Sequence, residues 1–298
     1  MQDIDFRQAH SPAHRPYLVF VRAGTQSLHT RLLAENPDRN WDCCVSWYVP
    51  PIREHLAEYY SAGGFNKLDG FLAFWKERPD PWPWRYVLLL DDDVYLRPRA
   101  LSQFFLLCEQ HSTYLSQPAL NWFTHTTLNV LVRNPACLMR RLSFVEVMAP
   151  CFSTAALEEL LPTFDWTRST WGTDVAWGCI LEGRHPVHVI DAVSMDHTRT
   201  GDGRPTAFYR KLTAMGVDPG QELRGILARF PDFGGQRMLK QGHIYRPGLP
   251  PALGPVLLVL FEKLKFIVRI RKQVLRNVRA WRANLQDRRR QRSVNKGE

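Results

Sequence analysis

The feature that most constrains the fold of this chain is a short apolar run that ends in three aspartates. Residues 86–90 are continuous and rich in aliphatic side chains, which predicts a buried strand of a parallel sheet. Asp91, Asp92 and Asp93 follow directly, at the end of the strand where open α/β sheets bind ligands. Adjacent carboxylates repel one another unless a cation compensates them, and Mg²⁺ or Mn²⁺ does so while binding phosphate oxygens on its other side. The run therefore predicts a metal–diphosphate site.

Strand and helix patterns alternate along the rest of the chain. Such alternation is typical of βαβ units and predicts an α/β fold, with a mostly parallel mixed sheet flanked by helices. We expect strands at 17–21, 41–48, 86–90, 114–120, 142–148 and 186–190, and helices at 27–34, 52–60, 68–75, 98–109, 155–161 and 174–181. Residues 200–250 are rich in Gly and Pro, which predicts loops. We expect residues 1–250 to form the catalytic domain and 251–298 a separate tail.

The net charge of +10 belongs to the tail. Residues 262–298 hold 13 Lys and Arg against 3 Asp and Glu, which leaves 39 − 13 = 26 basic and 29 − 3 = 26 acidic residues in the body. A neutral body does not imply a long-range field that attracts anionic substrates.

The tail has the pattern of a basic amphipathic helix. Its apolar residues recur at steps of three and four, with Lys and Arg between them: Leu260, Leu264, Ile267, Val274, Val278, Trp281 and Leu285. This pattern favours a helix lying on an anionic membrane surface. The alternative is nucleic-acid binding through Arg288, Arg289 and Arg290, which the hydrophobic face disfavours, so we expect no nucleic-acid partner.

Localisation follows from what the sequence lacks. No run reaches the ~18–20 apolar residues of a membrane span, the first residues lack a signal-peptide core, and the cysteines have no C-x-x-C or zinc spacing. These features predict a cytoplasmic protein, peripheral on the inner face of the membrane.

Two further motifs carry candidate chemistry. Asp174 follows Trp-Gly-Thr at the predicted start of a helix, where the helix dipole favours an ionised carboxylate that can act as a general base. The alternative is a simple helix cap. His197 follows Asp196 after the last predicted strand, where it either binds a metal or phosphate or has only a structural role.

The chain resembles inverting glycosyltransferases of the GT-A fold in the order of three motifs. These are an Asp-x-Asp after a strand, a Gly-x-Asp at a helix start and a late Asp-His. The resemblance implies that Asp91, Asp93 and His197 bind Mn²⁺ or Mg²⁺, and that Asp174 is the base. The sequence departs from the pattern at Thr173, where an acid often precedes the base.

The chain also resembles a plant and bacterial family that is catalogued as a domain of unknown function with GT-A-like character. The matching stretches are 115–120, 144–146 with 148–150, and 171–174, within about residues 85 to 197. Glu146 lies in an apolar strand pattern, where a charged side chain needs a partner or a function, so we expect it to contact the acceptor.

The expected reaction is transfer of a sugar from a nucleotide-sugar to a hydroxyl of a glycan or glycolipid acceptor, as in cell-surface polysaccharide or glycolipid synthesis. Four residues are candidates for binding the nucleotide-sugar. Arg22 and Asp42 follow or lie on the early strands, Lys67 precedes the aspartate strand, and Asp92 is the middle aspartate of the triplet. Besides Glu146, we expect His125 and Trp171 beside the acceptor.

Two other functions share parts of the pattern. Haloacid-dehalogenase-like phosphatases also place Asp-x-Asp after an apolar strand, but their fifth position is usually Thr or Val, and here it is Tyr95. A membrane adaptor with a degenerate transferase body would not need the four residues Asp91, Asp93, Asp174 and His197.

Overall fold

The structure, a computed structural model, describes residues 7–8, 14–33, 39–48, 57–77, 81–126, 128–198, 207–231, 242–250, 252–268 and 270–271. The chain divides into two compact units, Met1–Pro247 and Gly248–Glu298. The division predicted from the sequence lies three residues later, after residue 250.

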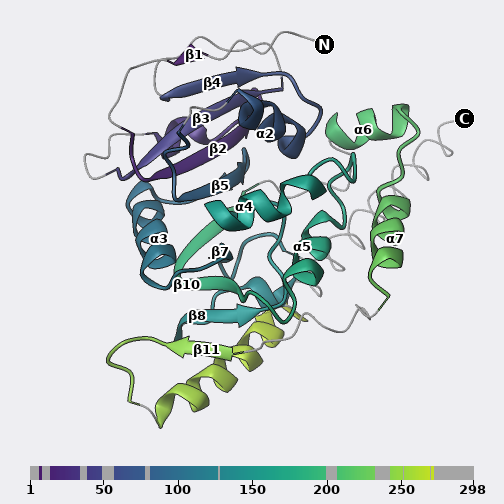
Figure 1. Cartoon of the computed structure of the whole chain (residues 1–298). Coiled ribbons are helices and arrows are strands. Elements are labelled where there is room, and N and C mark those ends of the chain that lie inside the picture. The colour runs from purple at the N-terminus through teal and green to yellow at the C-terminus, as the bar shows by residue number, and fades with distance from the viewer. Residues whose placement is uncertain are drawn as a thin grey trace, which may run out of the picture. The chain divides into compact units, whose positions relative to one another are not determined.

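The first unit is built on one mixed sheet, in the order β1-β4-β3-β2-β5-β9-β7-β10-β8-β11 (Figure 1). Its strands are β1 (Arg7–Gln8), β2 (Tyr17–Ala23), β3 (Trp41–Trp47), β4 (Tyr59–Ala62), β5 (Tyr86–Asp91), β7 (Leu115–Leu120), β8 (Cys137–Leu142), β9 (Cys151–Ser153), β10 (Val187–His197) and β11 (Gly242–Tyr245). The short β6 (Val94–Tyr95) pairs with the end of β10. The helices are α1 (His29–Leu32), α2 (Lys67–Lys76), α3 (Pro98–Gln110), α4 (Thr154–Leu160), α5 (Thr173–Leu181), α6 (Ala207–Ala214) and α7 (Pro219–Arg229).

The predicted α/β class is confirmed. Strands β4, β3, β2 and β5 are parallel to one another, and β7 and β10 are parallel to each other. Strand β9 lies antiparallel between β5 and β7, and β8 and β11 extend the sheet antiparallel beyond β10. Because β2, β3, β5, β7 and β10 share one direction through this order, their carboxyl ends meet at one edge.

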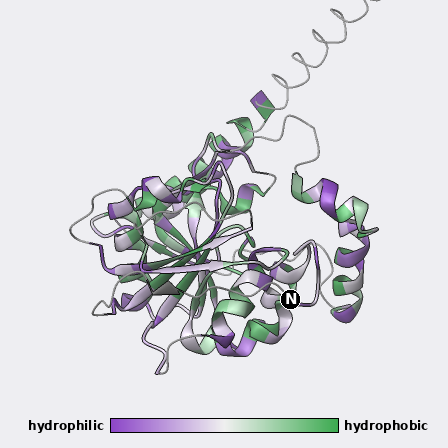
Figure 2. Ribbon diagram, turned by 90° about the horizontal axis from the view of Figure 1, so that it is seen from above, coloured by the Kyte–Doolittle hydropathy of each residue, from purple (hydrophilic) through white to green (hydrophobic). Residues whose placement is uncertain are grey.

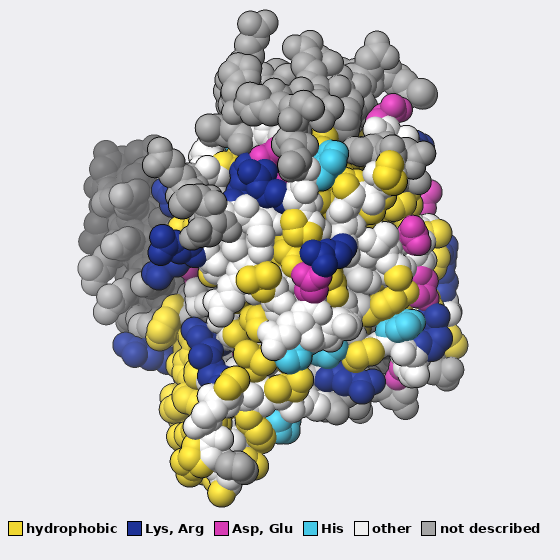
Figure 3. All heavy atoms as spheres, turned by 60° about the vertical axis from the view of Figure 1, so that its left-hand side comes forward, with side chains coloured by type: hydrophobic (Ala, Val, Ile, Leu, Met, Phe, Trp, Pro, Cys, Tyr) yellow, Lys and Arg dark blue, Asp and Glu magenta, His cyan; other side chains and the backbone are white. Residues whose placement is uncertain are grey.

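Helices cover both faces of the sheet, since alternate strand residues point to opposite faces. On one face, Phe20 and Leu89 pack with Phe71 of α2 and Trp177 of α5. On the other face, residues such as Leu88 pack with α3. Figure 2 shows the hydrophobic strands at the centre and polar residues on the outer sides of the helices. On the surface seen in Figure 3, basic and acidic side chains are interspersed.

Two predicted elements are wrong. Residues Tyr59 and Tyr60, expected at the end of a helix, begin strand β4; residues 52–56 of that helix lie outside the described residues. The strand predicted at 142–148 is instead the end of β8 followed by a turn. Its backbone N–H groups bind side chains: Glu146 N donates to Gln117 Oε1 (2.6 Å) and Val147 N to Asp174 Oδ2 (3.3 Å).

The segment predicted as loops contains helices α6 and α7 and strand β11. Helix α7 has a clear start signal, because the Asp218 side chain accepts from Gly220 N and Pro219 occupies the first turn. The predicted tail helix is described over residues 253–268, and residues 272–298 lie outside the described residues. Among the helices that the structure describes, none has the length and apolarity to cross a membrane.

Candidate active site

The aspartate triplet lies at the carboxyl edge of the sheet, as the sequence predicts. Asp91 is the last residue of β5 and pairs in register with Arg22 near the end of β2. After the turn, β6 pairs antiparallel with the last two residues of β10, Asp196 and His197. This pairing brings the triplet and the late histidine together, although about a hundred residues separate them in the chain.

Asp93 and His197 face each other across this junction. Asp93 Oδ2 lies 3.4 Å from His197 Nε2, and both side chains are partly exposed. The hydrogen bond with Asp93 raises the pKa of His197, against the opposing effect of burial. Thr198 holds the turn closed, since its N–H and hydroxyl both donate to the Asp93 carbonyl (2.9 and 2.8 Å). Thr124 fixes the backbone of His197 on the other side: its Oγ1 accepts from His197 N (2.6 Å).

Asp91 makes a different contact from the one expected. Its Oδ1 lies 2.7 Å from Nζ of Lys67, the first residue of α2. Lys67 is buried, and its ammonium also donates to the carbonyls of Val147 (2.6 Å) and Met148 (3.1 Å). Loss of solvation raises the pKa of Asp91, and the charge of Lys67 opposes that rise. Lys67 therefore anchors the 147–148 turn and Asp91 to each other, at the place where we expected it to meet a phosphate.

Asp174 lies in the first turn of α5, as predicted. Its Oδ2 accepts from Val147 N (3.3 Å) and its Oδ1 from Val175 N (2.9 Å). Burial nevertheless raises the pKa of Asp174 to about 6, which the backbone hydrogen bonds only partly offset. The sequence predicts that the helix start keeps this group ionised. The backbone N–H groups do favour the carboxylate, but burial outweighs them, so the pKa of Asp174 lies above its usual range.

Glu146 points into the same site. Burial, followed by the nearby charge of Asp174, raises the pKa of Glu146 to about 7, and the charge of His197 opposes that rise. Its Oε2 is buried and has no hydrogen-bond partner within the described part of the chain. A buried, unpaired carboxyl oxygen is costly unless a ligand satisfies it.

Asp92 and Arg22 brace the strand ends beside this cluster. Asp92 is buried, and its Oδ2 accepts from Gly24 N (2.8 Å) and the Tyr48 hydroxyl (3.2 Å). Arg22 donates to Ser46 Oγ (2.8 Å) and the Gly64 carbonyl (2.6 Å), and burial lowers its pKa to about 10. Both residues lie at the expected edge, where they join the loops that follow β2, β3 and β4.

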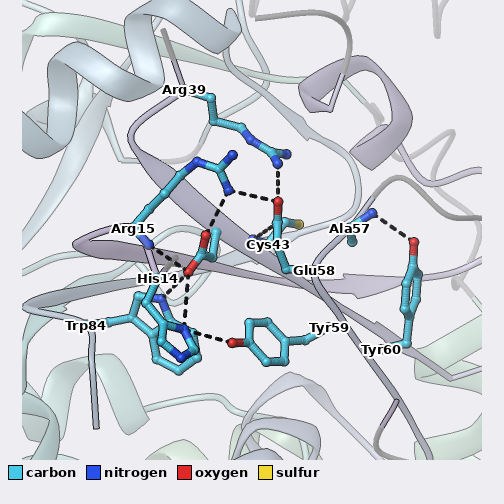
Figure 4. Close-up of polar contacts among 10 residues, drawn as sticks. His14, Arg15, Arg39, Cys43, Ala57, Glu58, Tyr59, Tyr60 and Trp84 are labelled. Carbon is cyan, nitrogen blue, oxygen red and sulfur yellow. Dashed lines mark hydrogen bonds and ion pairs between the residues drawn. The ribbon is translucent and has the colours of Figure 1, made fainter. Parts of the chain in front are cut away.

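Asp42 is not brought to this edge. It is the second residue of β3 and pairs in register with Leu18 of β2, at the amino ends of the strands. It is fully buried, and it accepts from Arg15 (3.1 and 3.0 Å) and from Trp84 Nε1 (2.9 Å) (Figure 4). Glu58 joins the same network through Arg15 (3.0 Å). The sequence located the strand correctly, but Asp42 lies near its amino end, so its side chain belongs to the opposite edge of the sheet.

The two expected acceptor contacts lie on separate loops. The His125 ring lies 5.7 Å from the His197 ring between centroids. Trp171 is 42% exposed, and its Nε1 donates to the Tyr209 hydroxyl (2.9 Å) of α6. Helix α7 holds the Trp171 loop, because Glu222 accepts from Arg168 N (2.7 Å) and Ser169 N (2.8 Å). Sequence reasoning missed these supporting residues, since it expected loops there.

The donor set at this edge suits a divalent cation only in part. Among the described residues, no three His, Cys, Asp or Glu side chains gather closely enough to hold a metal. Asp93 and His197 offer one carboxylate and one imidazole, which are ligands for Mn²⁺ or Mg²⁺ when a diphosphate and water complete the shell. A fit of this kind depends on the phosphate as much as on the protein.

No model of a known protein family matches the sequence, and no curated protein matches it, so the expected family of unknown function is not confirmed. Among solved structures, S. aureus TarS 1–349 is similar with a TM-score of 0.45 and 14% identity, over 73% of this chain and 72% of that chain. GalNAc-T7 with UDP, GalNAc and Mn²⁺ is similar with a TM-score of 0.49 and 9% identity, over 74% of this chain and 48% of that chain. TarS 1–349 in complex with UDP-GlcNAc is similar with a TM-score of 0.40 and 13% identity, over 73% of each chain.

Proposed function

We propose that the chain is a metal-dependent glycosyltransferase of the GT-A type that uses a nucleotide-sugar donor. The observation that carries the proposal is the pair Asp93 and His197, 3.4 Å apart at the carboxyl edge, beside a second cluster that contains Asp174 and Glu146. A cation held by the pair could bind a leaving diphosphate, and a carboxyl group with a raised pKa beside it could accept the proton of a hydroxyl that attacks the sugar.

Each side chain has a defined task in this proposal. Asp93 and His197 would hold Mn²⁺ or Mg²⁺, which supplies Lewis-acid stabilisation to a leaving diphosphate. Lys67 fixes the orientation of Asp91, and Asp92 fixes the loop after β2, where the nucleotide would lie.

Asp174 is the proposed base. With a pKa of about 6 it is ionised at neutral pH, yet basic enough to accept a proton from an acceptor hydroxyl as that hydroxyl attacks the anomeric carbon. Attack from the side opposite the leaving diphosphate inverts the anomeric centre. Glu146, whose buried Oε2 has no hydrogen-bond partner among the described residues, would accept a hydrogen bond from the acceptor. We propose a glycan or glycolipid acceptor, in cell-surface polysaccharide or glycolipid synthesis.

We also propose that the second unit binds the inner face of a membrane with anionic lipids. Within helix 253–268 and at residue 270, large apolar side chains are exposed at helical spacing: Val256, Val259, Leu260, Phe266, Ile267 and Ile270. Basic residues surround them in sequence, and apolar area with Lys and Arg beside it is the combination that favours an anionic lipid surface.

The test is a thermal-shift panel of nucleotide-sugars with and without Mn²⁺, followed by NMR of the product's anomeric configuration. We expect a donor that stabilises the protein only when the metal is present. Asp93→Asn should abolish that shift, whereas Asp165→Asn, at an exposed aspartate with no task in the proposed reaction, should retain it.

Three results would contradict the proposal. Donor binding that is independent of metal removes the role of Asp93 and His197. A product with retained configuration removes the inverting role of Asp174. Hydrolysis of phosphate monoesters without sugar transfer supports the phosphatase alternative instead.

A further inference from the structure

A pocket of about 410 Å³ lies next to the proposed active site, on the other side of the end of β10. Its lining is formed by Asn121, Trp122, Phe123, Arg133, Pro135 and Asp196. The volume falls within the range of about 300–1,000 Å³ of small-molecule sites. None of these residues has a task in the reaction proposed above.

One loop joins this pocket to the active site. Asn121 N donates to the Met195 carbonyl (2.9 Å), and Thr124 binds the backbone of His197 in both directions (2.6 and 3.0 Å). Asp196 and His197 are consecutive in a strand, so their side chains point to opposite sides. His197 faces Asp93, and Asp196 faces the pocket, where Asn121 Nδ2 donates to its Oδ1 (2.8 Å). A ligand in the pocket is therefore one residue away from the proposed metal site.

The lining combines flat apolar surface with polar groups of every hydrogen-bonding kind. Trp122 is held in place by its Nε1, which donates to the Arg133 carbonyl (2.8 Å), and Phe123 is 80% exposed beside it. A pyranose has an apolar C–H face that packs on aromatic rings and hydroxyls that both donate and accept. Asp196 accepts, Arg133 donates, and Asn121 does both.

Positive charge exceeds negative charge behind the pocket. Arg133 donates through Nε to the Asp191 carbonyl (3.0 Å), while the Asp191 carboxylate is occupied by both Nε and Nη2 of Arg140 (2.6 and 2.9 Å). Arg246 lies near enough to Arg133 to help lower its pKa, after the larger effect of burial. Arg246 Nε and Nη2 are buried and have no hydrogen-bond partner in the part of the chain that the structure describes. An anionic group at Arg133 would relieve this excess.

We infer that this pocket binds an acidic sugar of the acceptor, with its ring against Trp122 and its carboxylate on Arg133. The inference rests on the proposed transferase function, because it assigns the acceptor of the same reaction. It names the chemical class of that acceptor: a glycan that contains a uronic acid or a similar acidic sugar.

Saturation-transfer NMR on the full chain tests this, with glucuronate, glucose and acetate as probes. We expect glucuronate to bind more tightly than glucose by about tenfold, the effect of one charge-assisted contact. Arg133→Gln should remove that preference, and Arg133→Lys should restore part of it, because a lysine keeps the charge but not the guanidinium fork. Arg141→Gln, which removes an exposed arginine of β8, should keep the preference.

A second variant tests the sugar ring separately from folding. Phe123 is largely exposed, so Phe123→Ala should leave stability unchanged and weaken both glucuronate and glucose. The inference is overturned if acetate binds as tightly as glucuronate, if glucose equals glucuronate in the wild type, or if Arg133→Gln retains the preference in a folded protein.

The same samples separate the two proposals. Metal-dependent donor binding without glucuronate binding would remove this inference and leave the transferase proposal intact. Glucuronate binding without any donor binding would remove the transferase proposal and leave an acidic-sugar site.

Discussion

Asp174 and Glu146 are two carboxyl groups in one site, with pKa values raised to about 6 and about 7 by loss of solvation. The charge of Asp174 contributes to the raised pKa of Glu146, so Glu146 holds its proton to a higher pH than Asp174 does. Asp174 is the first of the two to ionise as the pH rises, and it is the one that backbone N–H groups hold in place. These differences assign the base role to Asp174 and the role of acceptor contact to Glu146.

Replacing Asp174 with Asn should lower the transfer rate by about 10²–10⁴-fold, the usual contribution of a general base. Donor binding in the presence of Mn²⁺ should stay within about twofold, since the side chain keeps its size and the amide oxygen can still accept from one of the two backbone N–H groups. Steady-state kinetics and donor titration measure the two effects. Substantial activity in this variant would assign the base to another residue.

The transfer rate should fall as the pH drops below about 6. A base works only when it is deprotonated, and burial places that transition near pH 6 for Asp174 instead of near 4. Below the transition, kcat/KM should decrease by about tenfold per pH unit. A pH–rate profile measures it, with thermal shifts at each pH as the control for unfolding. An acid limb near pH 4 would contradict the assignment.

At this scale the sequence predicted positions better than contacts. The strand end and the helix start are local patterns, and they placed Asp91, Asp93 and Asp174 correctly. Lys67 was predicted near the site, but its carbonyl partners lie 22 to 81 residues away in the chain, so no local pattern reveals that its ammonium is occupied.

Among the elements, the 143–150 turn shows why hydrophobic runs mislead. The apolar residues near Glu146 read as a strand, and the strand predicted there is wrong because side chains take the place of a neighbouring strand. Gln117 and Asp174 accept the N–H groups that a sheet partner would have bound. Helix α7 was missed for the opposite reason, since the Gly and Pro around it suggested loops although Asp218 and Pro219 form a good helix start.

Helix α5 approaches this turn so closely that a glycine is required. A Cβ atom built on Gly178 would lie 2.2 Å from the Ser143 carbonyl oxygen, which is backbone and cannot swing away. Gly178→Ala should therefore destabilise the protein by about 1–3 kcal/mol, and should also displace Asp174 from Val147.

Gly225→Ala is the matched control. Gly225 lies within α7, and no atom of the described residues lies within 4 Å of the added Cβ, so this change should be neutral or stabilise by up to about 1 kcal/mol. Urea unfolding of both variants measures the difference. Equal stability of the two would mean that α5 does not contact residue 143 this closely.

For the whole molecule, the alternating pattern was enough to predict the class of fold but not the order of the strands. Strand β9 has only three residues and lies antiparallel between β5 and β7, where no local signal announces it. Its position depends on pairings between segments far apart in the chain, which a single sequence does not show.

The second unit should carry membrane binding for the whole chain. Replacing Phe266 and Ile267 with Ser removes two exposed apolar side chains and should weaken binding to phosphatidylserine-containing vesicles by at least about tenfold. Vesicle co-sedimentation measures it, and high salt should weaken the wild type further.

The control for this change is Leu106→Ser, an exposed leucine of α3 in the first unit, which should bind vesicles like the wild type. If the double variant sediments as well as the wild type, the helix is not the anchor. If neutral phosphatidylcholine vesicles bind equally well, the proposed preference for anionic lipid is wrong.

At the amino edge of the sheet, acidic residues are sensitive to substitution because they stabilise the fold and not because they take part in sugar transfer. Asp42→Asn would remove the charged acceptor of Trp84 and one of the two charged acceptors of Arg15, and we expect a loss of about 2 kcal/mol in the free energy of unfolding. Asp93→Asn should abolish turnover while the protein accumulates normally. In a deep mutational scan, substitutions of both aspartates would reduce growth. Those at the amino edge would do so by lowering the amount of protein, and those at the carboxyl edge by removing activity from a protein of normal abundance.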